Sequence, residues 1–441
     1  MKTKLLVIAL PVVFLFSACT SDSGTSPSSI SSSSDVPLSS IVSSSSIVVP
    51  PTISLPASAN VAYPAALYET WKSRWLVSMA AEVAGGSTMD NSIFNGYAPM
   101  RVKWDNGDAS CEVTGLTTMT IALNRRTGCS VSESIGYGML IAMFQEDWTT
   151  FNGLWDYNRG ARNAHVSGLM PWKLHSFSQV LSTSAALDAD LDVATSLILA
   201  YYKTGLTPYL TDALVLINAI YEKGINKTNL LTYPGDTWTN KDVYNLSYFS
   251  PVAFRLFSFV DATHDWTAIL NAHYAYMKAI QLAGATQALF PDWSDASGVP
   301  KDPSNGSATN SYMLFDKESV RIAWRIAWDY YWFQSTDAQE VLTRMGNFVV
   351  AQTAGAPANI PAYSYNYLTG ALSTSSTSGV HYRGSYCLMG LGVNQAWLDA
   401  CALDVNSYTI TATGTYSGAY FREILQVMFS QLLNGEYVRP F

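Results

Sequence analysis

Apolar residues recur at helical spacing along most of the chain from about residue 59 onward. Segment 63–83, "YPAALYETWKSRWLVSMAAEV", repeats them about every 3.6 residues and carries Pro64 near its start, where a helix tolerates proline. The same pattern predicts further helices over 133–146, 188–204, 209–224, 248–260, 264–284, 318–333, 336–353, 384–400 and 418–434. Loops rich in Gly, Pro and Asn separate these segments, and no series of alternating strands stands out.

Some of these helices are apolar on more than one face. The segments "DLDVATSLILAYY" and "SVRIAWRIAWDYYWF" are the clearest examples. A helix that is apolar nearly all round is packed between neighbours on several sides. An inner and an outer layer of helices would produce this pattern. We therefore predict an all-α fold, an α/α toroid in which long loops at one end form the cleft.

The first 58 residues follow a different pattern. Lys2 and Lys4 precede the apolar run "LLVIALPVVFLF", which ends in small residues at Cys19 and is typical of a secretory signal. Because "FSAC" is similar to a bacterial lipobox, we expect a lipid on Cys19, with ordinary secretion as the alternative. Residues 20–58 are rich in Ser and Pro, which predicts a disordered tether. The predicted organisation is a signal peptide (1–19), a tether (20–58) and one large folded domain (59–441).

Charge and cysteine content narrow the class of protein. The chain has a net charge of −8, which argues against a basic surface for binding nucleic acid. With Cys19 lipidated, four cysteines remain in an oxidising compartment, and local pairing gives Cys111–Cys129 and Cys387–Cys401 as our choice among three connectivities. No Cys/His cluster has metal-ligand spacing, so we predict neither a metal nor another cofactor.

Glu133 is a carboxylate at the start of an apolar helical segment, "SESIGYGMLIAMF". Ser132 before it can act as an N-cap, which places Glu133 in the first helical turn, and Tyr137 can supply a phenol nearby. The helix dipole would favour the ionised carboxylate, whereas burial among aromatic groups would raise its pKa, as a general acid requires. A purely structural capping role is the alternative.

Two other acidic segments have helical spacing. Asp188 opens the helix "LDADLDVATSLILAYY", where helix capping is the alternative to a functional role. In "FDKESVRIAWRIAWDY", Asp316 and Glu318 precede Arg321, and Glu318 lies three residues before Arg321, close enough to pair with it. That pair is either a structural salt bridge or a functional carboxylate oriented by an arginine.

Aromatic residues are abundant, with 13 Trp, 26 Tyr and 17 Phe. Their faces stack on the apolar faces of sugar rings, and an acidic protein has sugars as likelier partners than nucleobases. Loop-flanked candidates for such contacts are Trp155, Trp172, Tyr248 and Tyr382. Any single ring can instead be part of the core.

Taken together, these segments resemble glycoside hydrolase family 8, inverting (α/α)6-barrel enzymes that act on β-1,4-linked glycans. "SESIGYGM" is similar to the family's general-acid motif S-E-G-x-G-Y-G-M, with Ser134 replacing a glycine. The resemblance implies that Glu133 donates the proton and that Asp188 binds the sugar at the cleavage point. It also implies that Trp172, in "LMPWKL", forms a sugar subsite and that Tyr248 belongs to an S-Y-F-S-P segment.

The segment of the catalytic base departs from the family pattern. "ESVRIAWRIAWDY" resembles Y-D-A-x-R-x-P-W-R, so Glu318 stands where Asp is usual, three residues before Arg321. Lys317 and Ala323 replace the usual Tyr and Pro. Asp316 is the competing base, and both assignments stay open.

The resemblance implies inverting hydrolysis without a cofactor. Glu133 would protonate the glycosidic oxygen, Glu318 or Asp316 would deprotonate a water on the opposite face of the sugar, and Asp188 would hold the sugar. We expect an exported monomer acting on a polysaccharide, with β-1,4-glucan favoured. The alternatives are xylan, a lyase or retaining hydrolase on the same toroid, and a non-catalytic glycan-binding protein.

Overall fold

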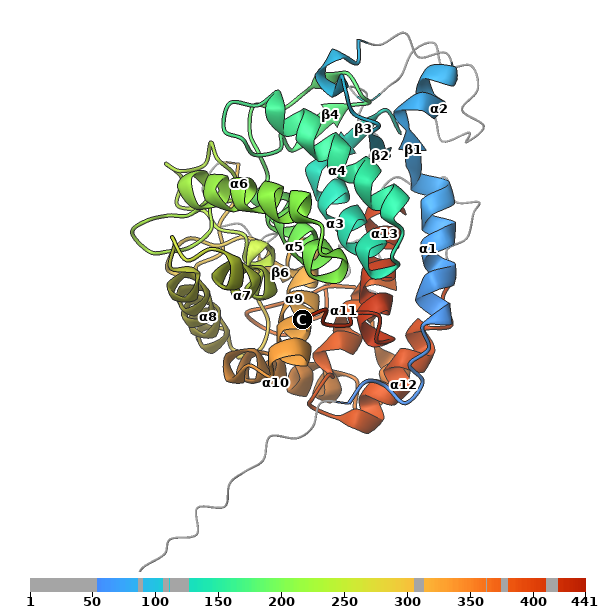
Figure 1. Ribbon diagram of the computed structural model, residues 1–441. Coiled ribbons are helices and arrows are strands. Elements are labelled where there is room, and N and C mark those ends of the chain that lie inside the picture. The colour runs from blue at the N-terminus through green and yellow to red at the C-terminus, as the bar shows by residue number, and fades with distance from the viewer. Residues whose placement is uncertain are drawn as a thin grey trace, which may run out of the picture. The chain divides into compact units, whose positions relative to one another are not determined.

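The computed structural model describes residues 54–85, 90–105, 111, 127–304, 313–361, 363–373, 380–409 and 419–441. Among these, helices that alternate along the chain pack side by side as an inner ring, in which each contacts the next and the last contacts the first (Figure 1). The ring consists of α3 (Ser132–Phe144), α5 (Leu187–Thr204), α7 (Pro251–Val260), α9 (Ile322–Phe333), α11 (Val380–Met389) and α13 (Ala419–Leu433).

A second layer of helices covers the ring from outside. Each outer helix packs on the inner helix next to it in sequence, except that α1 closes the layer by packing on α13 (Figure 1). These helices are α1 (Ala62–Trp75), α4 (Trp148–Asn163), α6 (Thr207–Gly224), α8 (Trp266–Ala283), α10 (Thr336–Gln352) and α12 (Gln395–Val405). The predicted toroid of inner and outer helices is confirmed.

Burial separates the two layers as their sequences predict. The inner helix α5 is buried without interruption from Leu187 to Ala200, because neighbours surround it. The outer helix α6 instead buries a single stripe at helical spacing that includes Tyr209, Ala213 and Leu216.

Short strands and single turns brace the segments that lead into the ring. The pairs are antiparallel: β1 with β2, β3 with β4, β4 with β5, and β6 with β7. Their bounds are β1 (Leu76–Ser78), β2 (Met100–Val102), β3 (Cys129–Val131), β4 (Lys173–His175), β5 (Gln179–Val180), β6 (Leu314–Phe315) and β7 (Tyr365–Asn366). The remaining elements are α2 (Met79–Ala84), η1 (Ser92–Phe94), η4 (Leu246–Tyr248), η6 (Ser319–Arg321) and η7 (Pro357–Asn359).

Two helix predictions differ from the structure, and one helix was not predicted. The predicted helix 63–83 is interrupted by β1, whose residue Val77 pairs with Arg101. The predicted helix 384–400 is two helices, α11 and α12, and between them Gly392 has a φ of +74°, a conformation that ends a helix. The outer helix α4 was not predicted.

The cysteine predictions are confirmed only in part. Cys111 and Cys129 form the predicted disulfide. The Cys387–Cys401 pairing is wrong, because both are free, buried thiols and burial together with a hydrogen bond to Cys401 raises the pKa of Cys387. An even cysteine count does not distinguish neighbouring thiols from a disulfide.

The start of the folded domain also lies earlier than predicted. Residues 54–58 of the predicted tether pack on the domain, where Pro56 is buried and the amide of Ala57 donates to Asp399 Oδ1 at 2.8 Å. Cys19 and the rest of the predicted signal and tether lie outside the described residues. Within the described part of the chain, no helix is long and apolar enough to cross a membrane.

Candidate active site

The N-terminal ends of inner helices bring the predicted catalytic residues to one place. Glu133 lies in the first turn of α3, Asp188 in the first turn of α5, and Arg321 directly before α9. Tyr420 lies at the start of α13. Hydrogen bonds join all four side chains, so these helix ends converge and direct their partial positive charge at the carboxylates.

The buried guanidinium of Arg321 joins three carboxyl groups. Its Nη1 donates to Glu133 Oε2 at 2.6 Å and to Asp188 Oδ2 at 3.0 Å, and its Nη2 donates to Glu318 Oε2. We call Glu133, Asp188 and Glu318 the carboxylate cluster. Only 1% of the Arg321 side chain is exposed, so water competes little with these contacts.

Glu133 has the electrostatics of an acid that keeps its proton near neutral pH. Burial raises its pKa to about 7, against the opposing effect of Arg321, and the neighbouring charges of Asp188 and Glu318 add to the increase. The hydroxyl of Tyr420 donates to Glu133 Oε1 at 3.0 Å and lowers the pKa by favouring the ionised form. The side chain remains 19% exposed, so a ligand can reach it.

Asp188 is more deeply buried than Glu133. Burial raises its pKa to about 6, again against Arg321, and only 2% of its side chain is exposed. Its Oδ1 accepts from the amide of Ala189 at 3.0 Å, while its Oδ2 lies on Arg321. Both oxygens of Asp188 therefore have partners within the protein.

The two base candidates have different surroundings. Glu318 Oε2 accepts from Arg321 and from Asn245 Nδ2 at 3.0 Å, whereas its Oε1 takes no hydrogen bond from any described residue. Asp316 instead accepts from the hydroxyl of Tyr382, and burial raises its pKa. The cluster thus includes Glu318 and leaves Asp316 outside.

The chain matches the sequence model of the glycosyl hydrolases family 8 over residues 122–433. It belongs to this family. The beta-glucanase of Niallia circulans is 28% identical over 371 residues, which cover 80% of this chain and 86% of that protein. Endoglucanase 2 of Ruminiclostridium josui is 32% identical over 225 residues, which cover 50% of this chain and only 46% of that protein.

Solved structures similar to this family 8 chain confirm its fold. The β-1,3-1,4-glucanase of Paenibacillus sp. X4 has a TM-score of 0.69 at 22% identity and covers 88% of this chain and 96% of its own. A reducing-end-xylose releasing exo-oligoxylanase has a TM-score of 0.63 at 18% identity, with 87% and 96% covered. The fold is the (α/α)6 barrel of these enzymes.

Trp172 is the predicted tryptophan whose backbone lies beside Glu133 of this family 8 chain, and Lys173 Nζ lies over its ring at 5.8 Å. Its carbonyl accepts from the amide of Ser132 at 2.9 Å, next to Glu133, and the residue is 38% exposed. Its ring packs edge-on against Trp104, with centroids 6.3 Å apart. This placement agrees with a sugar-stacking role.

Trp155 is not placed for substrate binding, which corrects that prediction. It lies on the outer helix α4, is 7% exposed, and donates from Nε1 to Asp212 Oδ2 at 2.6 Å. The guanidinium of Arg159 covers its face at 3.9 Å. Aromatic residues on an outer helix serve packing, and the sequence alone did not reveal that the segment was an outer helix.

The predicted tyrosines also have supporting contacts. Tyr137 is fully buried and its hydroxyl accepts from Arg321 at 3.0 Å, and Tyr382 is buried with its hydroxyl on Asp316. Both hydroxyls thus bind charged groups of the site, and the substrate-binding role of these two tyrosines stays a prediction. Tyr248 is buried too, but its ring lies over the Arg321 guanidinium at 5.8 Å and so borders the cluster.

Two further features of the site, Tyr420 and a tryptophan pair, were not predicted from the sequence. Trp238 and Trp293 stack at 5.9 Å with 19° between their planes, and Trp293 also contacts Tyr248 edge-on. Both tryptophans are half-buried and belong to the turn-rich loops "PGDTWTN" and "PDWSDASG". Their position in such loops was a sequence signal that could have marked them as candidate site residues. No local pattern marked Tyr420, because its role depends on closure of the ring.

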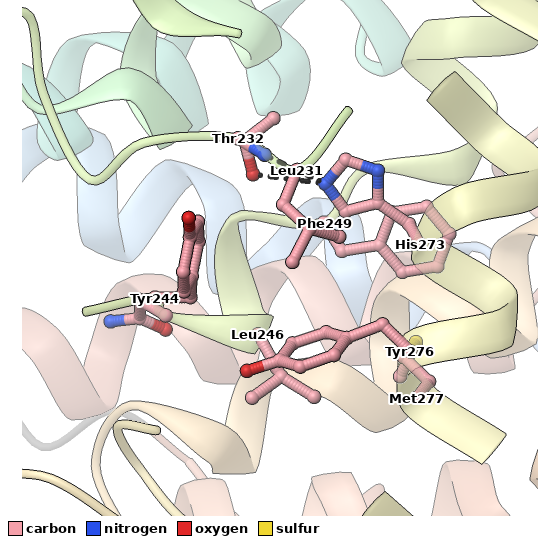
Figure 2. A pocket seen from close by; sticks show the side chains of 9 residues that line it. Leu231, Thr232, Tyr244, Leu246, Phe249, His273, Tyr276 and Met277 are labelled. Carbon is pink, nitrogen blue, oxygen red and sulfur yellow. Dashed lines mark hydrogen bonds between the residues drawn. The ribbon is translucent and has the colours of Figure 1, made fainter. Parts of the chain in front are cut away.

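A separate pocket lies against η4 and contains none of the cluster (Figure 2). Figure 2 shows Thr232 hydrogen-bonded to His273, whose Nε2 accepts from the Thr232 amide at 3.0 Å. Burial lowers the pKa of His273 to about 4, so the ring is neutral. The other residues that line it are Leu231, Tyr244, Asn245, Leu246, Phe249, Tyr276 and Met277. The mostly apolar lining supports η4 and offers no acid–base pair.

Proposed function

We propose that this chain is an inverting glycoside hydrolase that cleaves internal β-1,4 bonds of a β-1,4-glucan. The observation that carries the proposal is the carboxylate cluster, in which one guanidinium joins Glu133, Asp188 and Glu318. Two of these carboxyl groups, Glu133 and Glu318, lie in different environments, and such a pair supplies an acid and a base at the same pH.

Glu133 is the general acid in this proposal. A pKa raised to about 7 by burial keeps the carboxyl protonated in mildly acidic to neutral solution, and the proton goes to the glycosidic oxygen as that bond breaks. The exposed fraction of the side chain supports access to a substrate.

Glu318 is the general base. Arg321 and Asn245 both donate to its Oε2, which leaves Oε1 to take a proton from water. Inversion requires carboxyl groups about 6.5–9.5 Å apart so that the water fits between base and sugar. Glu133 Oε2 and Glu318 Oε2 bind different nitrogens of the same Arg321 guanidinium.

Asp188 binds the sugar at the cleavage point, and aromatic rings bind its neighbours. Trp172 flanks the cluster on the side of Glu133, and Trp293 flanks it on the side of Tyr248. The named activities of the relatives from Niallia circulans and Ruminiclostridium josui favour a glucan. Xylan is the second candidate, favoured by the similarity to the exo-oligoxylanase.

The decisive experiment is reducing-sugar release by the purified full chain on carboxymethylcellulose, lichenan, xylan and chitosan. We expect release from the glucans, with the α-anomer formed first in an NMR time course. Glu133→Gln should abolish release while leaving thermal unfolding and glycan binding intact. Near-normal activity of this variant, or no release from any glycan by the wild type, would refute the proposal.

The base assignment has its own test. Glu318→Ala should lose activity by about 10²–10⁴-fold, the usual contribution of a general base. Azide should rescue this variant and not Asp316→Ala. Rescue of Asp316→Ala alone would transfer the role to Asp316, and full activity in both variants would place the base elsewhere.

We further propose that the chain is exported and held at the membrane as a monomer by a lipid on Cys19. The signal-like N-terminus and the lipobox-like "FSAC" support this. Cys19→Ala should move the protein from the membrane fraction to the soluble fraction of its native type of host. Unchanged fractionation would contradict the anchor.

A further inference from the structure

Asp292 lies outside the carboxylate cluster but holds the segment that carries Glu318. The residue belongs to the loop between α8 and β6 and is 3% exposed. Its Oδ1 accepts from the backbone amides of Asp316 at 3.1 Å, Glu318 at 3.2 Å and Ser319 at 2.9 Å. The hydroxyl of Ser319 also donates to Oδ1 at 2.8 Å.

This single oxygen accepts from the amides of Glu318 and Ser319, which the local structure leaves open, whereas the amide of Asp316 also donates to Ser319 Oγ at 2.9 Å. Glu318 precedes η6, and its own side chain makes no capping hydrogen bond there. The amides at the start of such a turn have no partner within it and need one from outside. Asp292 supplies that partner from a distant loop, so the backbone of Glu318 depends on a residue 26 positions earlier.

The position of this backbone decides where the base carboxylate reaches. Glutamate has one more rotatable bond than the aspartate usual at this place, so its carboxylate samples a larger volume unless its backbone is fixed. Asn245 and Arg321 fix only Oε2. A displacement of about 1 Å at a reacting group can cost about 10²-fold in rate.

Asp292 also interacts electrostatically with this segment. Burial raises its pKa to about 7, and the charges of Glu318 and Asp316 add to the increase, while the hydrogen bonds from Ser319 oppose it. The charged groups that act on Asp292 thus include both base candidates.

We propose that Asp292 is a positioning residue for the general base Glu318. It fixes the backbone from Asp316 to Ser319 and thereby sets the reach of the Glu318 carboxylate. The inference rests on the proposed role of Glu318 in hydrolysis.

The first test compares variants at Asp292 on a soluble β-glucan. Asp292→Ala should lower kcat by about tenfold to a hundredfold with KM within about twofold of the wild type. Asp292→Asn should recover most of kcat, because its Oδ1 can accept the same donors. Equal loss in both variants, or a loss confined to KM, would overturn the proposal.

Asp295→Ala is the matched control. Asp295 lies in the same loop, and its Oδ1 accepts from Ser297 N, Ser297 Oγ and Val299 N, but none of these belongs to the base segment. This variant should lower the melting temperature and leave kcat near that of the wild type. A fall in kcat equal to that of Asp292→Ala would show a general loop effect and overturn the proposal.

A double-mutant cycle separates positioning from general stability. In a Glu318→Ala background, Asp292→Ala should cause no further loss of kcat, because the group it positions is absent. Multiplicative losses would overturn the proposal. If Asp292→Ala fails to fold, Ser319→Ala, which removes one donor, replaces it in the cycle with an expected loss of several-fold.

The outcomes distinguish this inference from the proposed function. Loss of activity in Glu318→Ala with none in Asp292→Ala would refute the positioning role alone. Full activity in Glu318→Ala would refute the base assignment and the positioning role together.

Discussion

Removing the hydroxyl of Tyr420 should raise the pKa of the acid Glu133. Tyr420 donates to Glu133 Oε1 at 3.0 Å, and this hydrogen bond favours the ionised carboxylate. In Tyr420→Phe the ring still packs against Trp75, with which it makes an edge contact at 6.2 Å. The ionised form alone loses a partner, so Glu133 keeps its proton to a higher pH.

The magnitude follows from the strength and exposure of that bond. A hydrogen bond to a charged group contributes about 1.5–3 kcal/mol, and 1.36 kcal/mol corresponds to one pKa unit. Because Glu133 is 19% exposed, water replaces part of the lost bond, and we expect an increase of about one unit. Burial already sets this pKa at about 7, so the variant should titrate about one unit higher.

The assay is the pH dependence of kcat/KM on a soluble β-glucan, whose alkaline limb reports the acid of the free enzyme. For the wild type the limb should fall near pH 7, and in Tyr420→Phe it should move upward. Tyr382→Phe is the control, because it removes an equivalent buried hydroxyl that binds Asp316. An unmoved or lowered limb in Tyr420→Phe, or an equal shift in the control, would refute this reasoning.

Three further predictions follow from the site and its supports. A Cβ at Gly136 would lie 2.9 Å from the carbonyl oxygen of Ala189, so Gly136→Ala should push α3 away from α5. We expect the variant to lose about 1–3 kcal/mol of stability, measured by thermal unfolding, and to have a lower kcat. An unchanged kcat would contradict the need for this close approach. Replacing Cys111 and Cys129 by Ser should destabilise the domain by about 3 kcal/mol in denaturant unfolding, and equal stability of oxidised and reduced wild type would argue against it. Trp172→Ala should raise KM several-fold with kcat nearly unchanged in steady-state kinetics, whereas a loss in kcat alone would exclude a stacking subsite.

The inner helices were predictable because apolar residues occur on more than one of their faces, which indicates burial on several sides. Segment 188–204 carries apolar residues on more than one face, and it forms a helix surrounded by neighbours. The outer helix α4 was missed because Gly153 and Gly160 weaken its local preference. Tertiary packing overrides that preference: a Cβ at Gly153 would lie 2.5 Å from Met100, and one at Gly160 would lie 2.4 Å from Phe94.

The site was predictable where the partners are close in sequence. Glu318 and Arg321 are three residues apart and pair as expected, because i and i+3 share a face in a helical turn. The choice between Glu318 and Asp316 depended on Tyr382, which comes from a different inner helix. Sequence spacing carries no information on such contacts, and Tyr420 was missed for the same reason.

The free-energy cost of burying the carboxylate cluster and the chemistry proposed for it have the same cause, which is the desolvation of the carboxylates. Fully ionised, Glu133, Asp188 and Glu318 would place three negative charges around the single positive charge of Arg321. Desolvation makes this excess unfavourable, and the raised pKa values of Glu133 and Asp188 reduce it by retaining a proton. The converging helix N-termini stabilise the charge that remains. A cluster that was solvated enough to ionise completely would be cheaper to fold, but it would hold no proton for a leaving group at neutral pH.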